Sequence, residues 1–80
     1  GKGYRRLQVG AYQSMVVADT IARNVREAIG SDILVEVTTV KEGAREVYRV
    51  RLGPVGKAGD LDDVQALLDR NGLPKGQRLP

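Results

Sequence analysis

Three polar side chains in this sequence have the types and spacing to bind a ligand together. Gln8 lies within "LQVGAY" at positions 7–12, and Arg49 and Arg51 lie within "YRVRLGPV" at positions 48–55. Both segments alternate apolar and polar residues, so each predicts a strand with one polar face. A planar amide beside guanidinium groups can donate several hydrogen bonds to hydroxyl, amide and carboxylate oxygens. Such a set suits a polar polymer that carries occasional carboxylates.

The composition argues against an enzyme, a metal site or a membrane span. The 80 residues include no Cys and no His, which removes the thiol nucleophile, the commonest general base and the commonest metal ligand. A carboxylate cluster at Asp60, Asp62 and Asp63 is better explained by the start of a helix than by a metal, because it lacks EF-hand spacing. We expect no catalysis, cofactor or metal. No apolar run approaches the roughly 20 residues of a membrane span, so we expect no membrane insertion.

The first strand is expected over 4–12, with Leu7 and Val9 facing a core. Its opposite face is then predicted to carry Arg6, Gln8 and Gly10. A helical pattern follows over 15–29, with Ser14 placed as its N-cap and Gly30 as its C-cap. Its apolar residues fall within one sector of the helix, so one face packs and the other is solvated.

Two more strands are expected over 33–40 and 47–52. The polar segment 41–45 between them predicts a hairpin loop longer than two residues. Gly53-Pro54 ends the third strand, because proline lacks the amide donor of the ladder.

A second helix is expected from about Asp60, which we assign as its N-cap with Asp63 three residues later. It ends at Asn71-Gly72. A short fourth strand is expected over 77–79.

The resulting order, β-α-β-β-α-β, predicts an α+β fold of the ferredoxin-like or RNP-like class in one domain over 1–80. Two helices cover one face of a four-stranded antiparallel sheet and leave the other face open. Strand three lies between strands one and two, which makes Gln8 a cross-strand neighbour of Arg49 or Arg51. The open face is then expected to carry Gln8, Val47, Arg49 and Arg51, with Arg6, Glu36 and Thr38 at its edges.

The tyrosines are expected to contribute less to this face. Tyr48 is in phase with Val50 and Leu52, so we assign it to the core or its edge. Tyr12 follows Gly10, where a bulge would change the phase of the strand. Two interpretations stay open for Tyr12: an exposed apolar plate, or a cap over the first helix.

Three explanations compete for the polar face. It can be an ordinary solvated sheet face, a nucleic-acid surface such as RNA-recognition domains use, or a docking surface for a protein. The net charge of +3 favours anionic partners only modestly. An RNA platform needs exposed aromatic residues, and this chain has no Phe or Trp.

The two strand motifs, with Ser14 and Ala18-Asp19 between them, resemble the sporulation-related (SPOR) domain family over nearly the whole chain. The resemblance implies a monomeric, non-catalytic periplasmic module. Its implied partner is peptidoglycan, specifically denuded glycan strands of N-acetylglucosamine and N-acetylmuramic acid at the division septum, and not nucleic acid. The glycan-binding residues that it implies are Gln8, Ala11, Tyr12, Val47, Arg49 and Arg51. Ala11 departs from a frequently serine-like position and Val47 from an often aromatic one.

Overall fold

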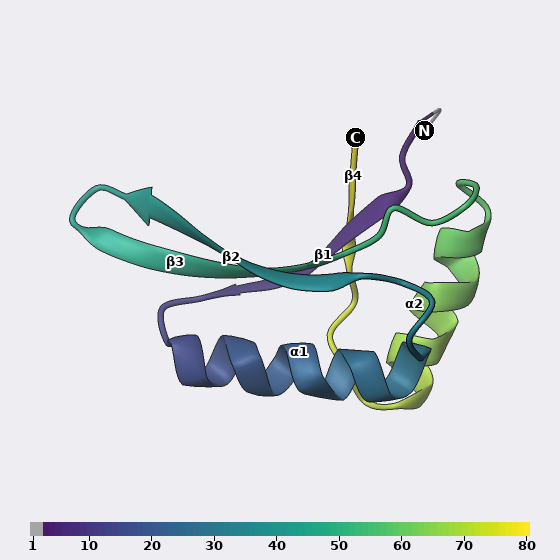
Figure 1. Cartoon of the computed structure of the whole chain (residues 1–80), viewed down its shortest axis with the longest axis horizontal. Helices are drawn as coiled ribbons and strands as arrows, with labels where there is room; N and C mark the ends of the chain where they lie inside the picture. Colours follow the sequence, from purple (N-terminus) through teal and green to yellow (C-terminus); the bar gives the residue numbers. More distant parts are fainter. Residues whose placement is uncertain (1–2) are drawn as a thin grey trace.

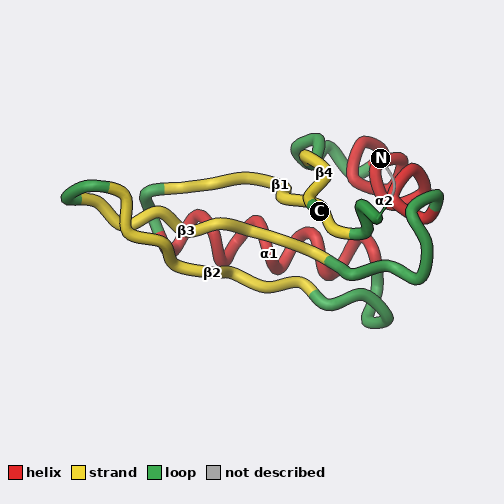
Figure 2. The backbone as a smooth tube through the Cα atoms, turned by 90° about the horizontal axis from the view of Figure 1, so that it is seen from above, coloured by secondary structure: helices red, strands yellow, loops and turns green. Residues whose placement is uncertain are grey.

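A computed structural model describes residues 3–80 and confirms the expected order of elements. The elements are β1 (Arg6–Tyr12), α1 (Met15–Ile29), β2 (Val35–Glu42), β3 (Arg45–Leu52), α2 (Asp60–Arg70) and β4 (Gln77–Leu79). The strands form one antiparallel sheet in the order β2-β3-β1-β4. Strand β3 therefore lies between β1 and β2, as Figure 2 shows from above. The predicted α+β class is confirmed.

Helix α1 begins and ends where its capping residues predict. The Ser14 side-chain oxygen accepts a hydrogen bond from the Val17 backbone N–H at 3.2 Å. At the other end, Gly30 has a φ of +83° and donates its backbone N–H to the Arg26 carbonyl at 2.9 Å. Glycine suits this end because it adopts positive φ without a steric penalty.

The core lies between the sheet and the helices, which occupy the same side of it. Helix α1 runs beneath the sheet, and α2 stands at one end, beside β4 (Figure 1). The largest fully buried side chains are Leu7, Leu52, Leu61, Leu68, Val25 and Val50. They come from both helices and from the two central strands, so burying them holds the helices on this side. The opposite face of the sheet has no helix over it.

A β-bulge in β1 changes the phase that simple alternation predicts. Gln8 is opposite Arg51, but Gly10 is opposite Val50 and Ala11 is opposite Arg49, with the register shift between Gln8 and Gly10. The expected place of Gly10 on the open face is therefore wrong, because its partner Val50 is buried on the helix side. A bulge adds one residue to one strand, so every later side chain moves to the opposite face.

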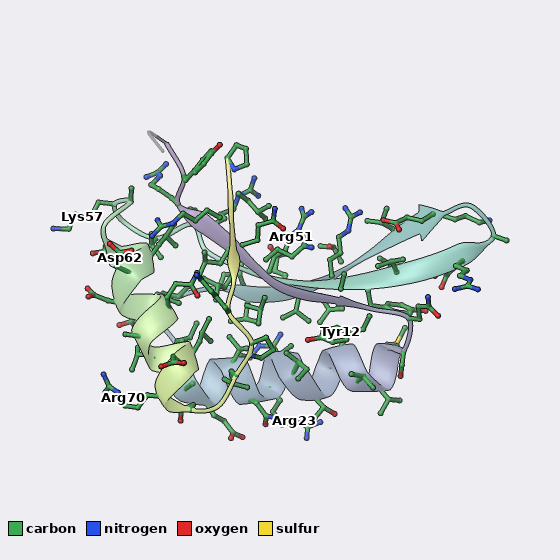
Figure 3. The ribbon with its side chains drawn as sticks, turned by 180° about the vertical axis from the view of Figure 1, so that it is seen from behind. Tyr12, Arg23, Arg51, Lys57, Asp62 and Arg70 are labelled. Carbon is green, nitrogen blue, oxygen red and sulfur yellow. The ribbon has the colours of Figure 1, made fainter. Side chains whose placement is uncertain are left out.

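Tyr12 follows this shift and lies on the helix side of the sheet. It pairs with Tyr48 and packs, partly buried, against the core. Figure 3 shows Tyr12 between the sheet and α1. Of the two interpretations of Tyr12, the structure supports the cap over the first helix and not the exposed apolar plate. A Cβ added at Gly10 would lie 2.6 Å from the Cζ of Tyr12, so the absence of a side chain at Gly10 makes room for the tyrosine ring.

Two expected local features are wrong. The β2–β3 loop has only two residues, Gly43 and Ala44, because Glu42 and Arg45 still pair. Gly43 has a φ of +63°, and glycine in the first position is typical of a type II′ hairpin turn. In α2 the N-cap is Gly59 with no side-chain hydrogen bond, and Asp60 is already helical. The carboxylates of its first turn still interact favourably with the positive end of the helix dipole.

We predict that Gly10→Ala lowers the free energy of unfolding by about 1–2 kcal/mol, because the new methyl group forces the Tyr12 ring away from the core. Urea unfolding followed by far-UV circular dichroism measures the change. In a Tyr12→Ala background the same substitution should cost much less, since the colliding ring is gone. Equal costs in both backgrounds would contradict this account.

Candidate functional site

The open face of the sheet gathers polar side chains from β1, β2 and β3. They alternate with the buried residues of each strand, and the register places them on neighbouring strands. On these three strands the residues of this face are Arg6, Gln8, Ala11, Glu36, Thr38, Val40, Glu42, Arg45, Val47, Arg49 and Arg51. Figure 3 shows Arg51 on the side of the sheet away from α1. The predicted polar face is therefore present and free of helices.

Gln8 and Arg51 form a direct side-chain hydrogen bond at the centre of this face. The two residues are cross-strand partners, and Arg51 donates its Nε–H to the Gln8 Oε1 at 2.9 Å. Because Nε–H can only donate, it holds the amide oxygen toward Arg51 and leaves the amide nitrogen directed elsewhere. Within residues 3–80, that nitrogen and the terminal nitrogens of Arg51 have no hydrogen-bond partner. Both groups can donate to a ligand.

Arg49 lies beside this pair, opposite the small side chain of Ala11. Its guanidinium forms an ion pair with Glu42 at 2.6 Å, and the two side chains are 27% and 53% exposed. Exposed ion pairs contribute only about 0–1 kcal/mol. A ligand carboxylate can therefore replace Glu42 as the partner of Arg49 at little cost.

The structure brings together most of the six predicted site residues. Gln8, Ala11, Arg49 and Arg51 form the centre, and Val47 lies farther along β3, opposite Val40. Tyr12 does not join them, because the bulge places it on the helix side. The open face therefore presents amide and guanidinium groups together with small apolar side chains.

All three tyrosines of the chain, Tyr4, Tyr12 and Tyr48, pack against the core. Tyr48 also donates its hydroxyl to Glu46 at 2.8 Å, and this hydrogen bond to a carboxylate raises the pKa of Tyr48. The chain has no other aromatic residue, so the open face lacks the stacking platform on which RNA-recognition domains depend.

Sequence reasoning missed two features of the site. Glu42 was assigned to a loop, so its ion pair with Arg49 could not be anticipated; only the register of the hairpin shows it. Thr38 was expected at the edge of the face, but its hydroxyl oxygen is buried without a hydrogen-bond partner among the described residues. It lines a small cavity together with Glu36, Arg51 and Leu34. Leu34 was expected inside the strand over 33–40, but β2 begins at Val35 and Leu34 precedes it.

Within the described part of the chain, no cluster of three or more acidic side chains could hold a metal ion. None of the helices described here has the length and apolar character needed to cross a membrane.

Comparison with known proteins agrees with this geometry. The family model described as "SPOR domain" matches residues 1–77. The crystal structure of the RlpA SPOR domain from Pseudomonas aeruginosa superimposes with a TM-score of 0.86 at 24% sequence identity, and the match covers 94% of this chain and 96% of that one. No curated protein sequence matches the chain. The third-strand segment "RVRLGP" resembles the corresponding segment of rare lipoprotein A, and the match to the RlpA SPOR domain shows a shared fold.

We predict that Thr38→Val raises the free energy of unfolding by about 1 kcal/mol, because it replaces a buried, unpartnered hydroxyl with a methyl group of similar shape. Chemical denaturation measures the change. Thr39→Val, at the exposed neighbouring position, is the matched control and should change stability by less than about 0.5 kcal/mol. A Thr38→Val protein that is less stable than the wild type would refute the prediction.

Proposed function

Because the chain belongs to the SPOR domain family, whose members bind peptidoglycan, we propose that its open sheet face binds denuded glycan strands, from which the stem peptides have been removed. The observation that carries the proposal is the grouping of Gln8, Arg49 and Arg51 on a face without a helix. Through this binding, the monomeric and non-catalytic domain brings its parent protein to the division septum, within the periplasm.

The charges of the glycan match the charges of the face. Each N-acetylmuramic acid of a denuded strand has a free lactyl carboxylate, whereas N-acetylglucosamine is neutral. Arg49 pairs with such a carboxylate in place of Glu42, since its present ion pair is exposed and weak. Hydrogen bonds between charged partners are about twice as strong as neutral ones. The free amide nitrogen of Gln8 donates to a hydroxyl or carbonyl oxygen of a neighbouring sugar.

A stem peptide would weaken this interaction in two ways. It converts the lactyl carboxylate into an amide, which removes the charge that Arg49 recognises. It also adds bulk above a sheet face where the ligand must lie close to the strands. Selectivity for denuded strands thus comes from a lost ion pair together with a steric conflict.

The small side chains of the face suit this mode of binding. Ala11 lies opposite Arg49 and adds no hydroxyl, so the guanidinium is the main polar group at that position. Val47 offers a sugar ring an apolar contact without aromatic stacking. Tyr12 has no part in the contact, because it packs on the helix side.

We predict that Arg49→Ala lowers the affinity for a peptide-free tetrasaccharide about tenfold or more, because it removes the partner of the lactyl carboxylate. Isothermal titration calorimetry and retention on amidase-treated sacculi measure the effect. Arg78→Ala is the charge-matched control, since Arg78 pairs with Asp62 on α2 and is not part of the open face. Wild-type affinity in a folded Arg49→Ala protein would overturn the proposal, as would tight, salt-sensitive RNA binding without glycan binding.

We also predict that Glu42→Gln raises the affinity for the same tetrasaccharide about two- to fivefold, because the carboxylate that competes for Arg49 is lost. Glu27→Gln on the exposed side of α1 changes the net charge equally and should leave the affinity nearly unchanged. Titration at two salt concentrations separates this local effect from general attraction. Equal gains in the two variants would show that Glu42 does not compete locally.

A further inference from the structure

The open face contains a small cavity beside Arg51, where β2 begins and β3 ends. Its volume is about 140 Å³. Its lining includes the side chains of Arg6, Leu34, Glu36, Thr38, Arg51 and Pro54. They come from β1, β2 and β3 and from the segments next to β2 and β3. We call this cavity the end pocket.

The polar groups of the end pocket have unused hydrogen-bonding capacity. Glu36 is the cross-strand partner of Arg51, yet it forms no ion pair with any residue in 3–80. The Thr38 hydroxyl oxygen is buried without a partner among the same residues. Arg51 uses only its Nε–H, toward Gln8, and Arg6 donates to the Pro80 carbonyl at 2.9 Å. The Glu36 carboxylate and the terminal nitrogens of Arg51 therefore stay free to accept from and donate to a ligand in the cavity.

The same cavity also has apolar walls. Leu34 is 58% exposed although it is a large aliphatic residue, and the Pro54 ring follows directly after Gly53. A ligand that fits this combination needs one hydrogen-bond donor, one acceptor and a small apolar group close together.

We propose that the end pocket binds the acetamido group of an N-acetylhexosamine unit, which makes it a subsite of the glycan-binding face proposed above and therefore dependent on that function. The acetamido carbonyl oxygen accepts from the guanidinium of Arg51, and its N–H donates to the Glu36 carboxylate. The methyl group packs against Leu34 and Pro54.

The charges of the pocket disfavour an ammonium group, because two guanidinium groups and only one carboxylate line it. A carboxylate or phosphate placed there would face Glu36, and an ammonium group would face Arg6 and Arg51. An amide both donates and accepts without carrying charge, so it avoids both conflicts. The pocket therefore distinguishes an N-acetylated sugar from its free-amine form.

Its position also allows one strand of glycan to reach Arg49 and the end pocket together. Arg49 and Arg51 are two residues apart on β3, which corresponds to roughly 6.6 Å along the strand. A lactyl carboxylate at Arg49 and an acetamido group in the end pocket then belong to the same short oligosaccharide.

The ligand itself provides the first test. A peptide-free tetrasaccharide is prepared with N-acetyl, N-formyl or free amino groups and titrated into the whole chain. We expect the N-formyl form to bind about threefold to fourfold more weakly, because it lacks one buried methyl group, and the free amine to bind more weakly still. Equal affinities for all three forms would overturn the inference while leaving the proposed function intact. Failure of the N-acetyl form itself to bind would overturn the proposed function.

A pair of variants links the effect to the pocket. Leu34→Ser removes an apolar wall and should abolish the difference between the N-acetyl and N-formyl forms, while affinity still depends on Arg49. Val16→Ser is the matched control, because Val16 is a 75% exposed aliphatic residue on α1, away from the open face. Circular dichroism verifies that both variants fold. A folded Leu34→Ser protein that still discriminates as the wild type does would refute the end pocket as the acetamido site.

Oligomers de-N-acetylated only at the glucosamine or only at the muramic acid residues identify the sugar that is recognised. Weaker binding in one of these two arms supports the proposal and assigns the pocket to that sugar. Unchanged affinity in both arms refutes it.

Discussion

The arrangement of the site depends on the bulge in β1. Upstream of it, Leu7 points into the core opposite Leu52 and Gln8 points to the open face opposite Arg51. Downstream, the extra residue moves Tyr12 to the helix side and Ala11 to the open face, opposite Arg49. One strand thus presents an amide and then a small side chain to the two arginines. Without the bulge, tyrosine would lie beside them and the hydrophobic side would lose a large residue.

The polar contacts of the open face contribute little to stability, so a ligand could replace them at little cost. The core is built from aliphatic residues on the other side of the sheet, and their burial supplies most of the stability of the fold. On the open face, the Arg49–Glu42 pair is exposed and the Gln8–Arg51 bond leaves several donors free. A ligand can replace or extend these contacts without disturbing the core.

This face differs from protein surfaces that bind carbohydrate or RNA by stacking it on exposed aromatic side chains. All three tyrosines are directed to the core, and Val47 and Ala11 are the apolar groups beside the arginines. A ligand of such a face would be held by charge and hydrogen bonds and not by aromatic stacking. The likeness to the RlpA SPOR domain, at 24% identity, is a likeness of fold.

Local patterning in the sequence determined the type and order of the elements. Alternation placed Gln8 and Arg51 on one face, Ser14 and Gly30 marked the ends of α1, and the missing Cys and His argued against common catalytic and metal chemistry. Only the tertiary structure decided the register. The bulge, the two-residue turn, the Glu42–Arg49 pair and the unpartnered Thr38 hydroxyl all depend on which residues face each other across strands. Periodicity along one strand shows which residues share a face, but their partners are selected by the packing of the whole sheet against the helices.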